Sequence, residues 1–349
     1  MSMGYRFIST EKGTPNGNRA ETCALLHLMC FAPECNQIDQ FAIDCFNDVT
    51  GMDNPCISLH DVQSKAGTNI TPGKLGEYLA TLFENCVSEF SQYFVTLTLF
   101  VGGVSSTTLQ DSTLTEFSFH HLQPKAQASV REHLERACRK RDNGIPDELI
   151  NGDNIDDFLS RVRFVIAKED ETEYIRALAH NSSAILPDRR TLLNIFGQIR
   201  DQQSSLKNRK GIAGKIIDRP DAVMDYGRIL SAHQIRLLVI QRLLNMDFLT
   251  DDSPDSFRSY LNSLPPEMRP EDVEEDCRNE LKLQYFDKNN KDAFWRLLDK
   301  VVTVFQDEPD ADIKEVYRRI DNNTLASCTH LTRPSHLYFI ATIKDGLRP

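Results

Sequence analysis

The sequence lacks the features that would assign it at once to a membrane, secreted or fibrous class. No apolar run approaches the ~20 residues that span a bilayer, which excludes an integral membrane protein. The N-terminal segment MSMGYRFISTEKGTPNGNR contains no apolar signal core, so secretion is not expected. Glycine (16 residues) and proline (15 residues) are present at ordinary levels, which excludes collagen-like and wholly disordered chains.

Closely paired cysteines are missing as well. The chain has nine cysteines, an odd number, and no two of them form a Cys-x-x-Cys pair. Most lie in apolar runs, which is typical of reduced thiols in the cytoplasm rather than of a disulfide framework or a zinc finger. We therefore expect a cytoplasmic protein without structural zinc.

The positive net charge that is common in DNA-binding modules is absent, because the formal net charge is −11. Two segments are nevertheless basic: residues 131–141 hold five basic residues against two acids, and residues 189–215 hold seven against one. These segments are either solvated helix faces or surfaces that contact phosphates. The second alternative assigns phosphate contacts to Arg131, Arg139, Lys140, Arg141, Arg209 and Lys210.

The hydrophobic pattern predicts two parts in the 349 residues. Residues 18–103 have the order helix, strand, strand, helix, strand, which is typical of a mixed α/β domain. Past residue 188 the pattern is mostly helical, with one strand-like segment, SHLYFIATI, near the C-terminus. We place a first domain at residues 1–215 and a helical second domain at residues 216–349.

The first part contains two strand-like runs: QFAIDCFNDVTG, read as one strand, and the run over residues 57–65. The next helix is predicted over residues 73–90. On the second run, alternation places Asp61, Gln63 and Lys65 on one face, and Asp48 closes the preceding run. Carboxylate and carbonyl oxygens are ligands that Mg²⁺ prefers, and an ammonium group nearby can position a water and offset charge on a phosphate.

This pattern predicts a metal-dependent phosphodiesterase. Asp48 would be the central metal ligand, Gln63 a carbonyl-oxygen ligand, and Lys65 the cationic partner. Extra negative charge could come from Asp44, from Asp61 or from Glu21 on the preceding helix. Asp44 lies four residues before Asp48, so regular pairing would place both on one strand face.

The order of Glu21 on a helix, Asp48 ending a strand, and Gln63-x-Lys65 on the next resembles the PD-(D/E)xK restriction-endonuclease-like superfamily in its Q-x-K variant. Two departures are visible: Gln63 replaces the usual acid, and Asn47 precedes Asp48 where the family has proline. The run FNDVTG…ISLHDVQSKAG is most similar to the double-stranded DNA endonuclease domains of bacterial antiphage systems. These are the effector nuclease of CBASS and the nuclease subunit of Lamassu.

The resemblance covers roughly residues 15–210. It implies an α/β restriction-endonuclease-like domain, with a mixed central sheet flanked by helices, followed by a mostly helical regulatory or oligomerisation domain. It implies cleavage of duplex DNA with Mg²⁺ or Mn²⁺ held by Asp48, Gln63 and the backbone carbonyl of Ser64, with Lys65 and Glu21 as further catalytic residues. A Lamassu-like arrangement also implies homo-oligomers, together with an SMC-like ATPase and an accessory subunit that restrain the nuclease.

Each of these residues also has a structural interpretation. Asn18 and Glu21 have the spacing of a helix capping box, which needs no catalysis. Gln63 and Lys65 could lie on the solvated face of an edge strand, where lysine discourages aggregation. The second functional hypothesis is therefore an inactive protein that keeps the nuclease fold and binds protein partners through its acidic helices.

Overall fold

The structure is a computed structural model. It describes residues 4–7, 14–140, 145–179, 188–207, 209, 211–244, 253–287 and 289–346. Two of the residues expected to contact phosphates, Arg141 and Lys210, lie outside these ranges.

The chain divides into two compact units. Unit 1 comprises Met1–Tyr174 and Phe196–Ile235, and unit 2 comprises Ile175–Ile195 and Arg236–Pro349. The sequence predicts a single boundary after residue 215, whereas the chain passes between the units several times. Residues 216–235 belong to unit 1 because the strands within them pair with strands from the beginning of the chain.

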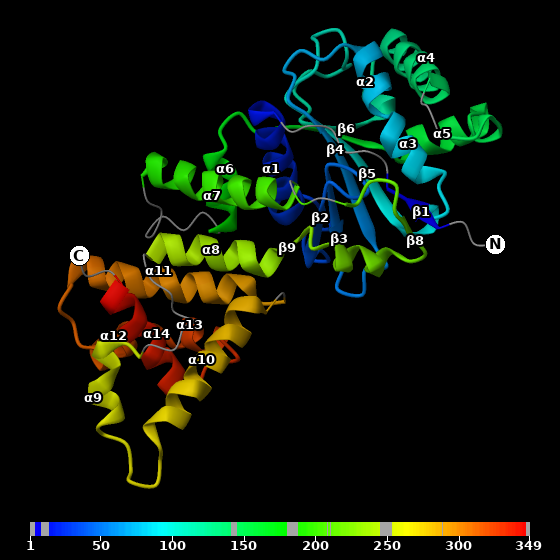
Figure 1. Cartoon of the computed structure of the whole chain (residues 1–349). Helices are drawn as coiled ribbons and strands as arrows, with labels where there is room; N and C mark the ends of the chain where they lie inside the picture. Colours follow the sequence, from blue (N-terminus) through cyan, green and yellow to red (C-terminus); the bar gives the residue numbers. More distant parts are fainter. Residues whose placement is uncertain are drawn as a thin grey trace. The chain divides into compact units, whose positions relative to one another are not determined.

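Unit 1 is a mixed α/β structure with a seven-stranded sheet and a separate two-stranded ribbon (Figure 1). Its strands are β1 (Tyr5–Arg6), β2 (Gln40–Ile43), β3 (Val49–Met52), β4 (Leu59–Lys65), β5 (Phe94–Val101), β6 (Glu116–Ser118), β7 (Arg163–Ile166), β8 (Ile216–Ile217) and β9 (Ile229–Ser231). The large sheet has the order β6-β7-β5-β4-β3-β2-β9, and β1 pairs with β8 in the ribbon. Strands β2, β3 and β4 run antiparallel in succession, whereas β4, β5 and β7 are parallel.

Helices flank both faces of this sheet (Figure 1). They are α1 (Pro15–Cys30), α2 (Pro72–Tyr78), α3 (Ala80–Cys86), α4 (Pro124–Lys140) and α5 (Gly152–Arg161). On one face His27 of α1 packs against Phe100 of β5, with ring centroids 5.8 Å apart. On the other face Asn85 of α3 donates a hydrogen bond to Asp61 of β4. The central strands β4 and β5 are therefore covered on both sides, and nearly all of their residues are buried.

Two predicted elements of unit 1 are each divided in the structure. The run over residues 40–51 is a hairpin of β2 and β3 rather than one strand, because Asp44 adopts φ 53° and turns the chain. The helix predicted over residues 73–90 is two helices, α2 and α3, which meet at Leu79. The strands predicted around residues 57–65, 93–103 and 161–168 are confirmed as β4, β5 and β7.

Three helices contain the points at which the chain passes between the units: α6 (Thr172–Leu178), α7 (Arg189–Lys207) and α8 (Ala232–Leu244). The remaining helices of unit 2 are α9 (Arg258–Leu261), α10 (Pro270–Phe286), α11 (Lys291–Asp307), α12 (Ile313–Arg319), α13 (Asn322–Ser327) and α14 (Arg333–Gly346). Their apolar faces form a core of their own, separate from the core of unit 1.

The strand-like prediction for SHLYFIATI is wrong, because this segment lies within α14. Residues Ser335–Lys344 of this helix are all buried. A helix that is buried on every side has no polar face, so its apolar run has the same appearance as a buried strand.

Two further expectations concern membranes and thiols. Within the described ranges, no helix is long and apolar enough to cross a membrane. All nine cysteines are free thiols, and seven of them are buried.

Candidate active site

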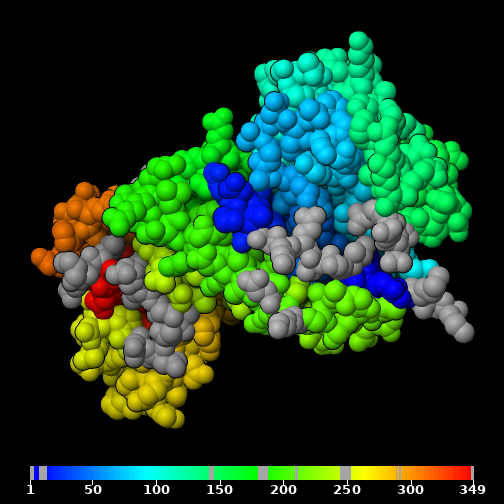
Figure 2. All heavy atoms as spheres, turned by 45° about the horizontal axis from the view of Figure 1, so that its top comes forward, coloured from blue at the N-terminus to red at the C-terminus, as the bar shows by residue number. Residues whose placement is uncertain are grey.

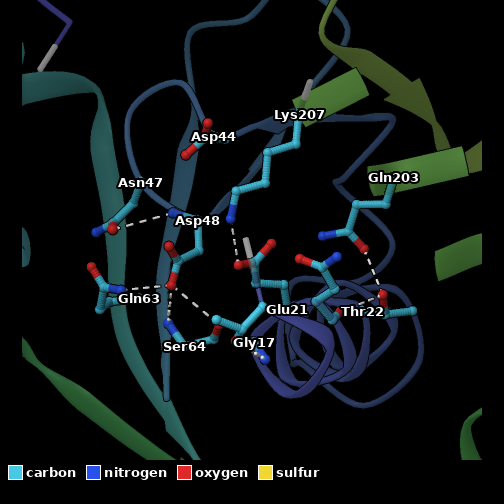
Figure 3. A network of polar contacts seen from close by, with 12 residues as sticks. Gly17, Glu21, Thr22, Asp44, Asn47, Asp48, Gln63, Ser64, Gln203 and Lys207 are labelled. Carbon is cyan, nitrogen blue, oxygen red and sulfur yellow. Dashed lines mark hydrogen bonds and ion pairs between the residues drawn. The ribbon is translucent and has the colours of Figure 1, made fainter. Parts of the chain in front are cut away.

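Asp48 lies at the turn between β2 and β3, immediately before the first residue of β3. Because Val49 pairs with Val62, the next position along the ladder places Asp48 opposite Gln63. Asp48 Oδ2 accepts a hydrogen bond from Gln63 Nε2 at 2.6 Å and from the backbone N–H of Ser64 at 2.7 Å (Figure 3). The Ser64 hydroxyl also donates to this oxygen, at 3.1 Å.

Lys65 ends β4 and belongs to the same corner of the sheet. Burial raises the pKa of Asp48, and the positive charge of Lys65 is the largest influence that lowers it. The Lys65 ammonium also lies 5.4 Å from the centroid of the Tyr78 ring, at the end of α2. The structure thus brings together three residues that the sequence predicts as a set: Asp48, Gln63 and Lys65.

The main chain of Ser64 also faces this corner. The Lys65 carbonyl accepts a hydrogen bond from Gly102, which follows β5. Successive residues of a strand direct their main-chain groups to opposite sides, so those of Ser64 point away from β5 and toward Asp48. The 2.7 Å contact from Ser64 N to Asp48 agrees with this direction.

Glu21 approaches from α1, and the capping-box interpretation of this residue is wrong. The N-cap of α1 is Thr14, whose hydroxyl accepts from Gly17 N, so Glu21 is well inside the helix. Its side chain is buried and accepts a hydrogen bond from Lys207 Nζ at 2.7 Å (Figure 3). Burial and the negative charge of Asp48 raise the pKa of Glu21 to about 7, although Lys207 opposes the shift.

Lys207 is a member of this site that the sequence did not single out. It ends α7, and its side chain is 9% exposed. Its charge acts on Glu21, Asp44 and Asp48. In the sequence it is one of seven basic residues between 189 and 215, and a cluster of cations gives no signal that one of them is buried.

Asp44 and Asp61 have other functions in the structure. Asp44 is bound to Arg228 through a buried ion pair of 2.9 Å, and burial raises its pKa to about 6. Asp61 accepts hydrogen bonds from three side chains: Thr50 at 2.7 Å, Asn85 at 2.7 Å and Asn47 at 3.2 Å. Both carboxylates fix the turn that carries Asp48. The expectation that Asp44 and Asp48 share one strand face is wrong, because they flank the hairpin turn.

The oxygen donors at this corner fit a hard divalent cation. Mg²⁺ is commonly held by one or two carboxylates together with waters and substrate phosphates. Asp48, the Gln63 amide and the Ser64 carbonyl supply that kind of set. Gln63 donates its amide nitrogen to Asp48. Rotation of the amide group by about 180° places Oε1 where Nε2 lies, so that the amide oxygen can face a cation bound at Asp48. In the described part of the chain, no group of three or more His, Cys, Asp or Glu side chains could hold a metal ion.

A pocket of about 610 Å³ lies in unit 1 between the start of α1 and the ends of β4 and β5; Asp48, Gln63 and Lys65 are not among its lining residues. One wall is the start of α1, with Asn16 and Arg19, and the other is formed by Ala66 and Gly102, which directly follow β4 and β5. Figure 2 shows the start of α1, in dark blue, at the surface beside the lighter blue atoms of the segment that follows β4. The carboxyl ends of parallel strands are a common place for ligands in α/β sheets.

The three arginines of α4 are engaged in ion pairs. Arg131 contacts Asp156 of α5. Arg139 contacts Glu135 at 3.0 Å and Asp147 at 3.6 Å. The acidic partners therefore neutralise the positive charge of Arg131 and Arg139, which the sequence predicted to contact phosphates.

The remaining residues of the two basic segments have separate environments. Lys140 ends α4, is exposed, and helps to lower the pKa of Glu77. Arg209 donates to the carbonyl of Gly227 at 2.6 Å. Among the described residues of these segments, Lys207 is the one that the structure brings to the candidate site.

No protein-family model, no curated protein and no solved structure matches this chain.

Proposed function

We propose that this protein is a metal-dependent endonuclease that cleaves duplex DNA. One observation carries the proposal: the side chains of Asp48 and Gln63 meet at one corner of the sheet, where the charge of Lys65 acts on Asp48. A carboxylate, a second oxygen donor and an ammonium group are the parts that metal-assisted hydrolysis of a phosphodiester requires. The mixed sheet flanked by helices also supports the restriction-endonuclease-like fold that the sequence resembles.

Asp48, the Gln63 amide oxygen and the Ser64 carbonyl would hold the cation. When bound, Mg²⁺ or Mn²⁺ supplies a polarised phosphate and a water of lowered pKa. Lys65 would orient the attacking water and offset the charge that develops on the phosphate. Its ammonium group lies 5.4 Å from the centroid of the Tyr78 ring, a cation–π contact that favours this position.

The pocket between the start of α1 and the ends of β4 and β5 would accept the substrate. Its volume of about 610 Å³ lies within the range of ligand sites. Arg19 and Lys168 line it and supply positive charge near the phosphates, although Arg19 also contacts Glu171. We infer duplex DNA, rather than another phosphodiester, from the resemblance.

The defence role is inferred from the same resemblance. We propose that the helical unit 2 mediates homo-oligomerisation and binds an SMC-like ATPase and an accessory subunit, which hold the nuclease inactive until it assembles. Genes for such subunits beside this one would support this arrangement, and a neighbouring nucleotide cyclase gene would favour the CBASS-like alternative.

The test is plasmid cleavage by the full chain, fractionated by oligomeric state, with Mg²⁺, Mn²⁺ or EDTA. We expect metal-dependent cleavage by an oligomeric fraction, reduced at least about 100-fold in Lys65→Ala, since a cation that stabilises a transition state contributes on that scale. Lys74→Ala is the matched control, because Lys74 is an exposed lysine paired with Glu77 on α2. It should cleave like the wild type.

Absence of cleavage in every oligomeric fraction would contradict the proposal. The alternative would then be a catalytically inactive nuclease-fold protein that serves as an interaction module. The replacement of an acid by Gln63 is the feature that favours this alternative.

A further inference from the structure

Lys207 is a buried cation whose position is fixed by two contacts between α7 and α1. Its Nζ lies 2.7 Å from Glu21 Oε1, and the two side chains are 9% and 8% exposed. One turn earlier on the same face of α7, Gln203 accepts a hydrogen bond from the Thr22 hydroxyl at 2.9 Å. Gln203 is buried as well. The ammonium group is therefore held by the packing of two helices.

The charge of Lys207 is directed at the acidic residues around Asp48. It forms the ion pair with Glu21 and interacts electrostatically with Asp44 and Asp48. Figure 3 shows the lysine side chain extending toward Glu21, with Asp48 nearby. Asp44 has a second cation, Arg228. Two of the three carboxylates thus have ion-pair partners supplied by the protein.

We propose that Lys207 is a built-in counter-cation that holds Glu21 away from the metal and limits the site to one divalent cation, bound at Asp48. The proposal rests on the proposed function. For Glu21 to become a ligand, its carboxylate would have to leave a buried ion pair, and breaking such a pair is strongly unfavourable. A second divalent cation beside Glu21 would also be repelled by the ammonium group. Lys207 is thus a positioning residue for Glu21.

The test is Mn²⁺ binding to the full chain without DNA, measured by isothermal titration calorimetry. We expect one Mn²⁺ per wild-type chain. Lys207→Met keeps the length of the side chain but removes its charge, and should bind Mn²⁺ at least about ten-fold more tightly or bind a second ion. Lys207→Arg should restore wild-type binding. Lys74→Met is the control for loss of a lysine elsewhere, and should bind like the wild type.

A double-mutant cycle separates this role from a merely structural one. Glu21→Gln alone should change Mn²⁺ affinity by less than about two-fold, because the Glu21 carboxylate is already paired with the Lys207 ammonium group. When Glu21→Gln is combined with Lys207→Met, the increase in Mn²⁺ affinity expected for Lys207→Met should disappear. Circular dichroism confirms that each variant is folded.

The outcomes distinguish the two proposals. If Asp48→Asn abolishes Mn²⁺ binding while Lys207→Met binds as the wild type or more weakly, the role of Lys207 is overturned and the proposed nuclease is supported. If neither the wild type nor Lys207→Met binds Mn²⁺, the role of Lys207 is also overturned, and plasmid cleavage decides the fate of the nuclease proposal separately.

Discussion

At the scale of single residues, the buried acids of unit 1 differ in the kind of partner that each one has. Glu21 and Asp44 pair with the cations Lys207 and Arg228, and Asp61 accepts from three neutral side chains. Asp48 Oδ2 also accepts from neutral donors, but it lies at the end of the sheet and is only partly buried. Of these four carboxylates, Asp48 is therefore the one best placed to meet a cation.

The alternation of β4 predicts that Gln63 and Lys65 share one face, because a strand has a fixed period of two, and the preceding strand-like run is expected to bring Asp48 to them. Lys207 could not be predicted in the same way. It is 186 residues from Glu21 in sequence, and only the packing of α7 against α1 brings the two together. The roles of Asp44 and Asp61 also depend on partners from distant elements, Arg228 and Asn85.

His27 gives a pH-dependent prediction at the same scale. Burial, and to a lesser extent Arg163 and Lys168, lowers its pKa to about 4, while Glu34 opposes the shift. Glu116 lies 3.7 Å from its ring. The ordinary pKa of histidine is 6.5, so the unfolded chain binds the proton first as the pH falls. The stability that neutral His27 contributes is therefore complete above pH 6.5 and is lost between about pH 6.5 and 4.

We expect His27→Gln to remove this part of the pH dependence. The free energy of unfolding of the wild type, relative to that of the variant, should fall by about 1.5 kcal/mol between pH 6.5 and 5.0. Urea denaturation at the two pH values measures it. The exposed His120→Gln serves as the control and should keep the wild-type dependence. A constant difference between wild type and His27→Gln would mean that His27 takes up its proton as readily in the folded as in the unfolded chain.

At the scale of elements, the strongly patterned strands were predicted and the buried helix was not. Strand β5 has the sequence FVTLTLFV, rich in β-branched and aromatic residues, and strands of this composition are recognised reliably. The segment within α14 has a similar composition but is helical, because the surrounding helices of unit 2 bury it on every side. Tertiary packing decides between helix and strand for such a segment, and local sequence does not encode it.

Phe339 tests the packing of α14. Its side chain is fully buried, and its ring centroid lies 5.3 Å from that of Phe294 of α11. We expect Phe339→Ala to lower the free energy of unfolding of unit 2 by about 3 to 5 kcal/mol, because it leaves a cavity. Leu283→Ala removes an exposed side chain of α10 and should change the free energy of unfolding of unit 2 by less than about 0.5 kcal/mol. Urea denaturation followed by the fluorescence of Trp295 reports on this unit; equal effects of the two changes would contradict the position of α14.

At the scale of the whole molecule, a net charge of −11 opposes the binding of DNA. Ion pairs within the fold compensate further positive charge, as at Arg131 and Arg139. Binding to a polyanion must then depend on a few cations near the site, and the affinity should fall steeply with salt. For the proposed nuclease we therefore expect weak DNA binding by the monomer, as the proposed activation by assembly requires.

The path of the DNA can be found from the salt dependence of binding, measured by the fluorescence anisotropy of a labelled duplex without metal. Lys168 lines the pocket between α1 and the ends of β4 and β5, so Lys168→Gln should reduce the slope of log affinity against log salt by about one. Arg131→Gln should leave the slope unchanged, because its guanidinium already contacts Asp156. If Arg131→Gln instead reduces the slope and Lys168→Gln does not, the phosphates follow α4 and the pocket is not the substrate site.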